Sequence, residues 1–122
     1  MEINTETRGE IFKEKDLRFR IMDDENLFFD LIDIFTEEIP KELLLLEATL
    51  KNDDYDKIIR QSHKIKGSCA SLGAEKMEAI AREIEDGALE GEDLESLRQR
   101  FVLCNLIYIE LSEHLKGFKR PI

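Results

Sequence analysis

The clearest pattern of apolar and polar positions lies in the last third of the chain. Apolar residues recur there at three- and four-residue spacings, which predicts one long amphipathic helix. The series comprises Leu94, Leu97, Phe101, Cys104, Tyr108, Leu111 and Leu115. Asp93 or Glu92 can cap the start, and Lys116 with Gly117 suits the last turn. Five further residues broaden its apolar face, so we expect it to be covered on a second side, by the N-terminal segment: Val102, Leu103, Leu106, Ile107 and Ile109.

The same periodicity predicts further helices upstream. A narrow stripe from Met77 to Ala88 indicates a helix that ends near Gly87 or Gly91. A helix over residues 53–72 begins after Asn52 or Asp53 and is stopped by Gly73. Another stripe covers residues 27–50, and we expect Pro40 to kink or break it. Residues 10–22 predict a short lid helix.

No segment alternates in the manner of a sheet, and the connections between the last three helices are short. We therefore predict an all-α fold, an antiparallel up-and-down four-helix bundle with a short N-terminal capping helix. The bundle domain is expected over residues 12–118, with residues 1–11 as an N-terminal extension.

The charge and composition of the chain disfavour some classes of binding partner. The chain has 122 residues and a net charge of -10, which disfavours nucleic acid. No apolar run reaches the roughly 20 residues of a membrane span, and no secretory signal opens the sequence, so a cytoplasmic location is expected. Cys69 and Cys104 occupy apolar helix faces and are interpreted as buried thiols rather than a disulfide or metal ligands.

His63 stands apart from the apolar face of its helix. With about 100° per residue, it lies roughly 125° from the centre of the apolar sector, so its ring is expected to face solvent. A surface histidine usually has no special role, but Gly67 follows one turn later at a cost of about 1 kcal/mol relative to alanine. Lys66 is a helix-surface neighbour of His63. A bare patch and a cation beside an imidazole suit an anion attached to the ring.

The stretch HKIKGSCASLGA, residues 63–74, resembles the HxxKGS signature of histidine-containing phosphotransfer (HPt) domains of multistep phosphorelays. The resemblance covers about residues 12–116. It implies that His63 accepts a phosphoryl group, that Lys66 and Lys64 stabilise its charge, and that Gly67, with Ala70 and Arg60, leaves access for a partner. The predicted fold places the site histidine in the second half of the second bundle hairpin.

The resemblance further implies the partners. A response-regulator receiver domain exchanges the phosphoryl group through its aspartate and brings the Mg²⁺, while a sensor or hybrid histidine kinase stands upstream. No cofactor of the chain's own is expected. Because the sequence contains no ATP-binding loop, we interpret the chain as a phosphocarrier rather than a kinase.

Other functions leave weaker signals. The metal-binding motifs HExxH and paired ExxH are absent, and the second histidine, His114, is distant in sequence. A hydrolase is disfavoured because Ser62 points toward the core and no carboxylate is obviously placed to orient His63. The alternative that stays open is a helical docking or adaptor module that carries no phosphate. We expect a monomer, although the apolar face of the last helix could also mediate a homodimer.

Overall fold

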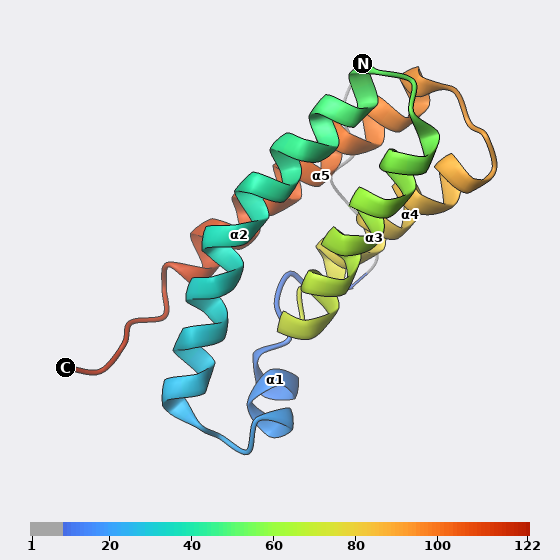
Figure 1. Cartoon of the computed structure of the whole chain (residues 1–122). Helices are drawn as coiled ribbons and strands as arrows, with labels where there is room; N and C mark the ends of the chain where they lie inside the picture. Colours follow the sequence, from blue (N-terminus) through green and yellow to red (C-terminus); the bar gives the residue numbers. More distant parts are fainter. Residues whose placement is uncertain (1–8) are drawn as a thin grey trace.

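The computed structural model describes residues 9–122, all of whose regular elements are α-helices (Figure 1). A short helix, α1, precedes four longer ones. The helices are α1 (Glu14–Arg20), α2 (Glu25–Lys51), α3 (Tyr55–Leu72), α4 (Glu75–Leu89) and α5 (Leu94–Leu115). Within this part of the chain, every helix falls short of the length and apolar character that a membrane crossing requires. The prediction of an all-α fold is confirmed.

Aspartate side chains begin the three longest helices. Asp24 accepts a hydrogen bond from the Leu27 backbone N–H, Asp54 from that of Lys57, and Asp93 from that of Ser96. Each carboxylate satisfies a backbone donor that has no partner within its helix. The cap of α3 is thus Asp54, one or two residues later than expected, because Asn52 closes α2 and Asp53 adopts a positive φ of 53°.

Pro40 does not break α2. The helix continues from Glu25 to Lys51 with Pro40 inside it, so the alternative of a break at this position is wrong. Buried residues on both sides of Pro40, including Phe35, Ile39, Leu43 and Leu46, keep the helix packed on the core. Their burial outweighs the loss of one backbone hydrogen bond.

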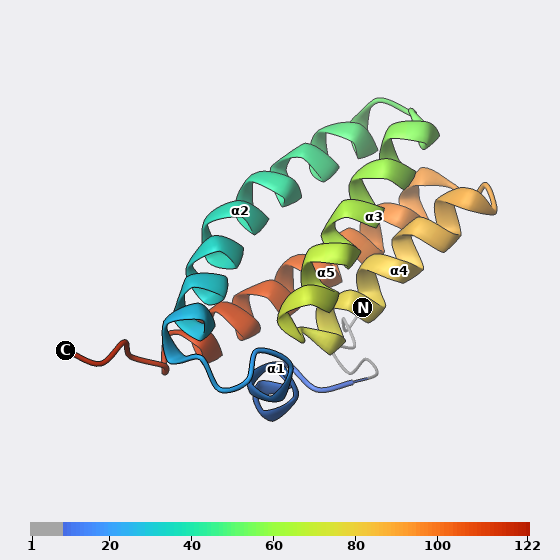
Figure 2. The same ribbon diagram turned by 60° about the horizontal axis from the view of Figure 1, so that its bottom comes forward.

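The long helices form a ring in which α2 packs on α3, α3 on α4, α4 on α5 and α5 on α2. Consecutive helices run in opposite directions, as both views show (Figures 1 and 2). Their apolar faces meet in one core, with fully buried side chains from every helix. Examples are Leu17, Phe28, Leu46, Ile58, Ile65, Ile84, Leu97 and Ile107. Cys69 and Cys104 lie in this core as free, buried thiols, as predicted.

The histidine-bearing helix, α3, is the second arm of the first bundle hairpin, which α2 and α3 form. The prediction that placed it in the second hairpin is therefore wrong. The reason lies in α1, whose 7 residues span about 10 Å and make it too short to serve as an arm beside a 27-residue α2.

The N-terminal segment lies across one end of the helices (Figure 2). Lys13 donates its backbone N–H to the carbonyl of Gly73 at 2.9 Å, and Lys76 donates to Glu10 at 2.9 Å. The lid helix is thus shorter than the expected 10–22 and covers the α3–α4 turn. Residues 1–8, most of the expected extension, lie outside the described residues.

The middle of α5 stays open, contrary to expectation. Val102, Leu106 and Ile109 are 44%, 38% and 57% exposed. Within residues 9–24, the contacts to α5 lie at its far end, where the ring of Phe12 packs on those of His114 and Phe118. The described part of the N-terminal segment therefore caps the end of the bundle and does not cover this face.

Candidate functional site

His63 lies in the middle of α3 with its side chain 67% exposed, where the helical wheel predicts it. The helix surface next to His63 is uncrowded. A Cβ atom built on Gly67 would meet nothing within 4 Å, and Ala70 and Arg60 are exposed on the same side of the helix. A large partner can therefore approach the imidazole without displacing any part of the described chain.

The main feature that the sequence did not reveal is Glu85 on α4. Its Oε2 atom lies 2.7 Å from Nδ1 of His63, and its Oε1 atom accepts a hydrogen bond from Nζ of Lys66 at 2.5 Å. The side chain of Glu85 is only 9% exposed. The expectation that no carboxylate orients His63 is therefore wrong, and the site is a triad of His63, Lys66 and Glu85.

Helix pairing explains why Glu85 was missed. In the sequence it stands among other acidic residues, next to Ile84 and at the edge of the apolar stripe of α4. Nothing in that pattern says which helix lies opposite. Only the packing of α4 against α3 turns this edge toward His63. The weak signal available was that Glu85 lies four residues after the buried Ala81 and three before the buried Ala88.

The charge of Glu85 is well compensated. Burial alone would raise the pKa of its carboxyl group, but the hydrogen bonds from Lys66 and His63 outweigh burial and hold the pKa below its ordinary value of 4.5. Glu85 is therefore an ionised carboxylate near neutral pH. An ionised carboxylate only accepts hydrogen bonds, so Nδ1 of His63 is the donor and carries the proton.

This assignment distinguishes the two ring nitrogens. With the proton of a neutral imidazole held on Nδ1 by Glu85, the lone pair lies on Nε2. The site thus offers one nucleophilic nitrogen on an exposed ring, a buried carboxylate on the other nitrogen and an ammonium group next to both. The carboxylate thus orients a ring whose other nitrogen can act as the nucleophile.

Lys64 belongs to a different contact. Its Nζ atom lies 3.1 Å from Oε1 of Glu42, a buried residue of α2, and Nε2 of Gln61 also donates to Glu42. This network joins α3 to α2, whereas His63 and Lys66 face α4. The structure therefore brings Lys66, but not Lys64, to the carboxylate that binds His63.

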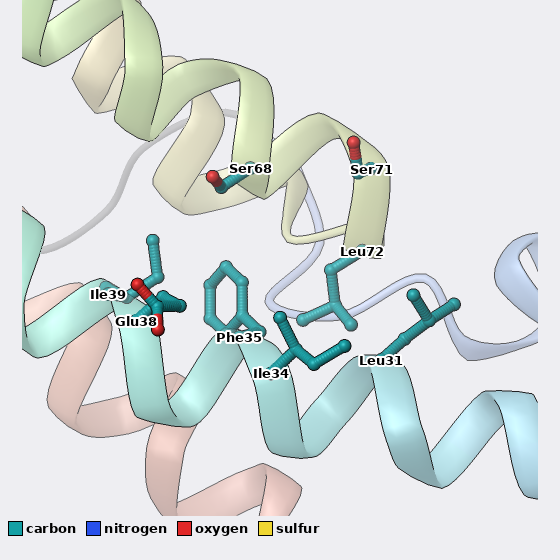
Figure 3. Close-up of a pocket in the computed structure, with 8 residues that line it drawn as sticks. All are labelled: Leu31, Ile34, Phe35, Glu38, Ile39, Ser68, Ser71 and Leu72. Carbon is teal, nitrogen blue, oxygen red and sulfur yellow. The ribbon is translucent and has the colours of Figure 1, made fainter.

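An apolar groove of about 190 Å³ runs between α2 and α3 (Figure 3). Leu31, Ile34 and Phe35 of α2 point toward Ser68, Ser71 and Leu72 of α3, and Ile34 is 57% exposed. Gly67, next to Ser68, lies on the solvent-facing ridge of α3 between the groove and His63, here called the crest of α3. The groove and His63 thus lie on the two sides of a helix whose crest carries no side chain at that point.

Residues 9–122 contain no group of three or more His, Cys, Asp or Glu side chains that could hold a metal ion. Glu85 is in contact with Lys66 and His63 rather than with other carboxylates. The geometry is that of a nucleophile and its supporting charges.

The comparison with protein families finds a match that covers most of the chain. The model of the Hpt domain matches residues 30–116, which include α3, α4, α5 and most of α2. The match starts later than residue 12, where the sequence resemblance was expected to begin. No curated protein and no solved structure matches the chain. Because the family model covers well over half of the sequence and includes the whole site, this chain belongs to the Hpt domain family.

Proposed function

We propose that this protein is a phosphorelay intermediate that carries a phosphoryl group on Nε2 of His63 and exchanges it with the aspartate of a receiver domain. The family implies histidine phosphotransfer in phosphorelays. The observation that supports His63 as the acceptor is its exposed ring, whose Nδ1 is bound to a buried, ionised Glu85. The four long helices serve as the up-and-down bundle that holds this ring at mid-helix.

The transfer step needs only these groups. The lone pair on Nε2 attacks the phosphorus of an aspartyl phosphate, the N–P bond forms, and the O–P bond breaks to release the aspartate carboxylate. The ring then carries the phosphoryl group on one nitrogen and a proton on the other, so it is cationic. Glu85 stabilises that positive charge from 2.7 Å, and the step is reversible because no proton leaves the site.

Lys66 and Gly67 have supporting roles in the proposal. The ammonium group of Lys66 is held by Glu85 and is 23% exposed, so it remains available to an anion on the neighbouring ring. Gly67 leaves the crest of α3 bare, which lets a partner approach closely. Lys64, bound to Glu42, contributes through the local positive field rather than through contact.

The receiver domain is proposed to cover both sides of the α3 crest. Its active-site end would lie over His63, between Arg60 and Ala70, and an apolar side chain would enter the groove at Ile34 and Phe35. The Mg²⁺ required for aspartyl phosphate chemistry would come with the receiver. The proposed role is that of a phosphocarrier in the cytoplasm, supplied by a sensor or hybrid kinase. It agrees with a sequence in which no ATP-binding loop is found.

The test is a transfer assay with phosphorylated receiver domains. Wild type is expected to acquire label that is stable in alkali and labile in acid, and to return it to an unphosphorylated receiver. His63→Gln should bind the receiver with unchanged affinity and acquire no label. Unlabelled wild type that still binds the receiver would contradict the proposal and favour an adaptor that carries no phosphate.

A further inference from the structure

The exposed apolar stripe of α5 lies on the opposite side of the molecule from His63. In the ring of helices, α5 contacts α2 and α4 and stands diagonally across from α3. Val102, Leu106 and Ile109 are 44%, 38% and 57% exposed and follow one face of α5 at helical spacing. Three neighbouring apolar side chains that are exposed together indicate a contact surface.

The stripe continues into a groove on α2. This groove, of about 310 Å³, lies between Pro40, Leu43 and Leu44 of α2 and Phe101, Asn105 and Tyr108 of α5. Leu44 is 68% exposed at its edge. Asn105 lines the groove, and it lies three residues after Val102 and four before Ile109 on the same side of α5. The stripe and the groove therefore form one surface, here called the α5 face: Leu44, Val102, Asn105, Leu106 and Ile109.

The charged residues that flank the α5 face would meet opposite charges if the α5 helices of two copies packed antiparallel. A two-fold axis between Asn105 and Leu106 would place Val102 opposite Ile109 of a second copy. The same axis would place Arg98 opposite Glu113 of that copy. All of these side chains are exposed. Within one chain Arg98 donates to the Leu50 carbonyl of α2 at 2.9 Å and Glu113 pairs with Lys116 at 2.9 Å, so pairing with the second copy would exchange these contacts for intermolecular ones.

The next pair outward follows the same rule. Glu95 would lie opposite Lys116 of the second copy, and both side chains are exposed. An apolar centre with two oppositely charged pairs on each side of the axis is the pattern of an isologous interface. A parallel two-fold arrangement would instead place each of these charged residues beside the same residue of the second copy.

We infer that the α5 face binds a second copy of this chain, with the two α5 helices antiparallel about an axis between Asn105 and Leu106. Each copy has a net charge of -10, which opposes association, but salt at physiological strength screens charges beyond about 8 Å. The short central stripe indicates a weak dimer at the low end of interface sizes. The expected monomer is the alternative that the experiments below test.

The dimer goes beyond the proposed function and is compatible with it. Since α3 is diagonally opposite α5, both copies would keep His63 exposed on outward surfaces. Two receiver domains could therefore bind one dimer without contact between them. The dimer does not depend on phosphate chemistry, so its test is independent of the transfer assay.

Sedimentation velocity over a series from micromolar to millimolar protein tests the inference directly. The wild-type mass should rise from 14.3 kDa toward twice that value as concentration increases. Leu106→Glu, with Leu106→Ser as a milder variant, should remain at the monomer mass. Ile34→Glu is the matched control, because Ile34 is equally apolar and 57% exposed but lies on α2 beside α3. It should dimerise like wild type.

Mixing two charge variants tests the register. Arg98→Glu places like charges opposite each other in its own dimer, and Glu113→Arg does the same with positive charges. Each alone should be monomeric, whereas an equimolar mixture should dimerise because both cross-pairs are then opposite in sign. Circular dichroism of each variant should match wild type. A monomeric wild type, a dimer that persists in Leu106→Glu, or a mixture that stays monomeric would overturn the inference.

Discussion

At His63, the two ring nitrogens have different surroundings, and the proposed chemistry depends on that difference. Nδ1 is 2.7 Å from a buried carboxylate oxygen, while the ring as a whole is largely exposed. A lone exposed histidine would distribute its proton over both nitrogens. The contact with Glu85 selects one tautomer, so the attacking atom is defined before a partner arrives.

Replacing Glu85 by glutamine tests this selection. The amide keeps the size of the side chain but removes the charge that stabilises the cationic ring. A hydrogen bond to a charged group is worth about 1.5–3 kcal/mol, and the loss of about 1.4 kcal/mol in the transition state corresponds to about tenfold slower transfer. Imidazole ¹⁵N chemical shifts should also change from one tautomer to a mixture.

Glu83→Gln is the control for this substitution, since Glu83 is an exposed carboxylate of the same helix. It should change neither the ¹⁵N shifts nor the transfer rate. If Glu85→Gln left both unchanged as well, the carboxylate would have only a structural role.

Gly67 and Gly87 allow a matched comparison of two helical glycines. A Cβ at Gly67 would meet nothing within 4 Å, whereas at Gly87 it would lie 2.9 Å from Cδ2 of Leu97. Gly67→Ala should therefore gain about 1 kcal/mol of unfolding free energy from helix propensity. Overpacking costs about 1–3 kcal/mol, so Gly87→Ala should be less stable than Gly67→Ala by at least about 1 kcal/mol.

The larger Gly67→Gln should fold normally but slow phosphoryl transfer, because its side chain would occupy the path of the receiver. Urea unfolding and transfer kinetics on the same samples check both parts. Transfer at the wild-type rate would mean that the bare crest of α3 serves no partner.

Single-residue features of the site were predictable only where they lie on one helix. The exposure of His63, its proximity to Lys66 and the bare Gly67 follow from helical spacing alone. Glu85 and the Glu42 contact of Lys64 come from neighbouring helices. Periodicity within a helix does not determine which residues of another helix lie opposite.

At the scale of elements, the triad of His63, Lys66 and Glu85 links α3 to α4. The stability that this link contributes should depend on pH. The folded-state pKa of Glu85 is below its ordinary value of 4.5, so the folded protein binds this proton more weakly than the unfolded chain. The resulting stabilisation is complete above pH 4.5 and is lost as pH falls through the lowered value.

The stability difference between wild type and Glu85→Gln measures this contribution. Urea unfolding should give a difference that is present above pH 4.5 and shrinks as the pH falls further. A difference that does not change with pH would show that Glu85 is not the group responsible.

Cys69 of α3 and Cys104 of α5 provide a test of the packing of the core. Burial raises the pKa of Cys104 to about 12 and that of Cys69 well above its ordinary value. The reactive thiolate is therefore scarce, and both sulfurs are inaccessible. Reaction with a thiol reagent near pH 7 should be slow and should follow the rate of unfolding. Rapid reaction of either thiol in the native state would contradict the described packing.

The elements themselves were largely predictable. Helix type, most boundaries and the stop at Gly73 follow from spacing and capping residues, and Gly73 has the expected positive φ of 94°. Pro40 was harder to predict because local sequence shows the lost hydrogen bond but not the buried residues that hold α2 together. The open face of α5 was missed for the same reason, since coverage depends on where distant segments lie.

At the scale of the molecule, the ring of helices gives the protein two faces with different properties. The α3 side presents a nucleophile, a bare crest and an apolar groove. The diagonal α5 side presents an apolar stripe between self-complementary charges. The proposed phosphoryl exchange and the inferred self-association would therefore occupy separate surfaces, and variants on one side should leave the other unaffected.

The central claim concerns one atom, Nε2 of His63, and NMR can observe it directly. The chain labelled with ¹⁵N-histidine is incubated with a phosphorylated receiver domain, and the imidazole signals are recorded at alkaline pH. The account predicts a phosphorus coupling on Nε2 of His63 and none on Nδ1. Phosphorus on Nδ1, on His114, or on no histidine at all would contradict it.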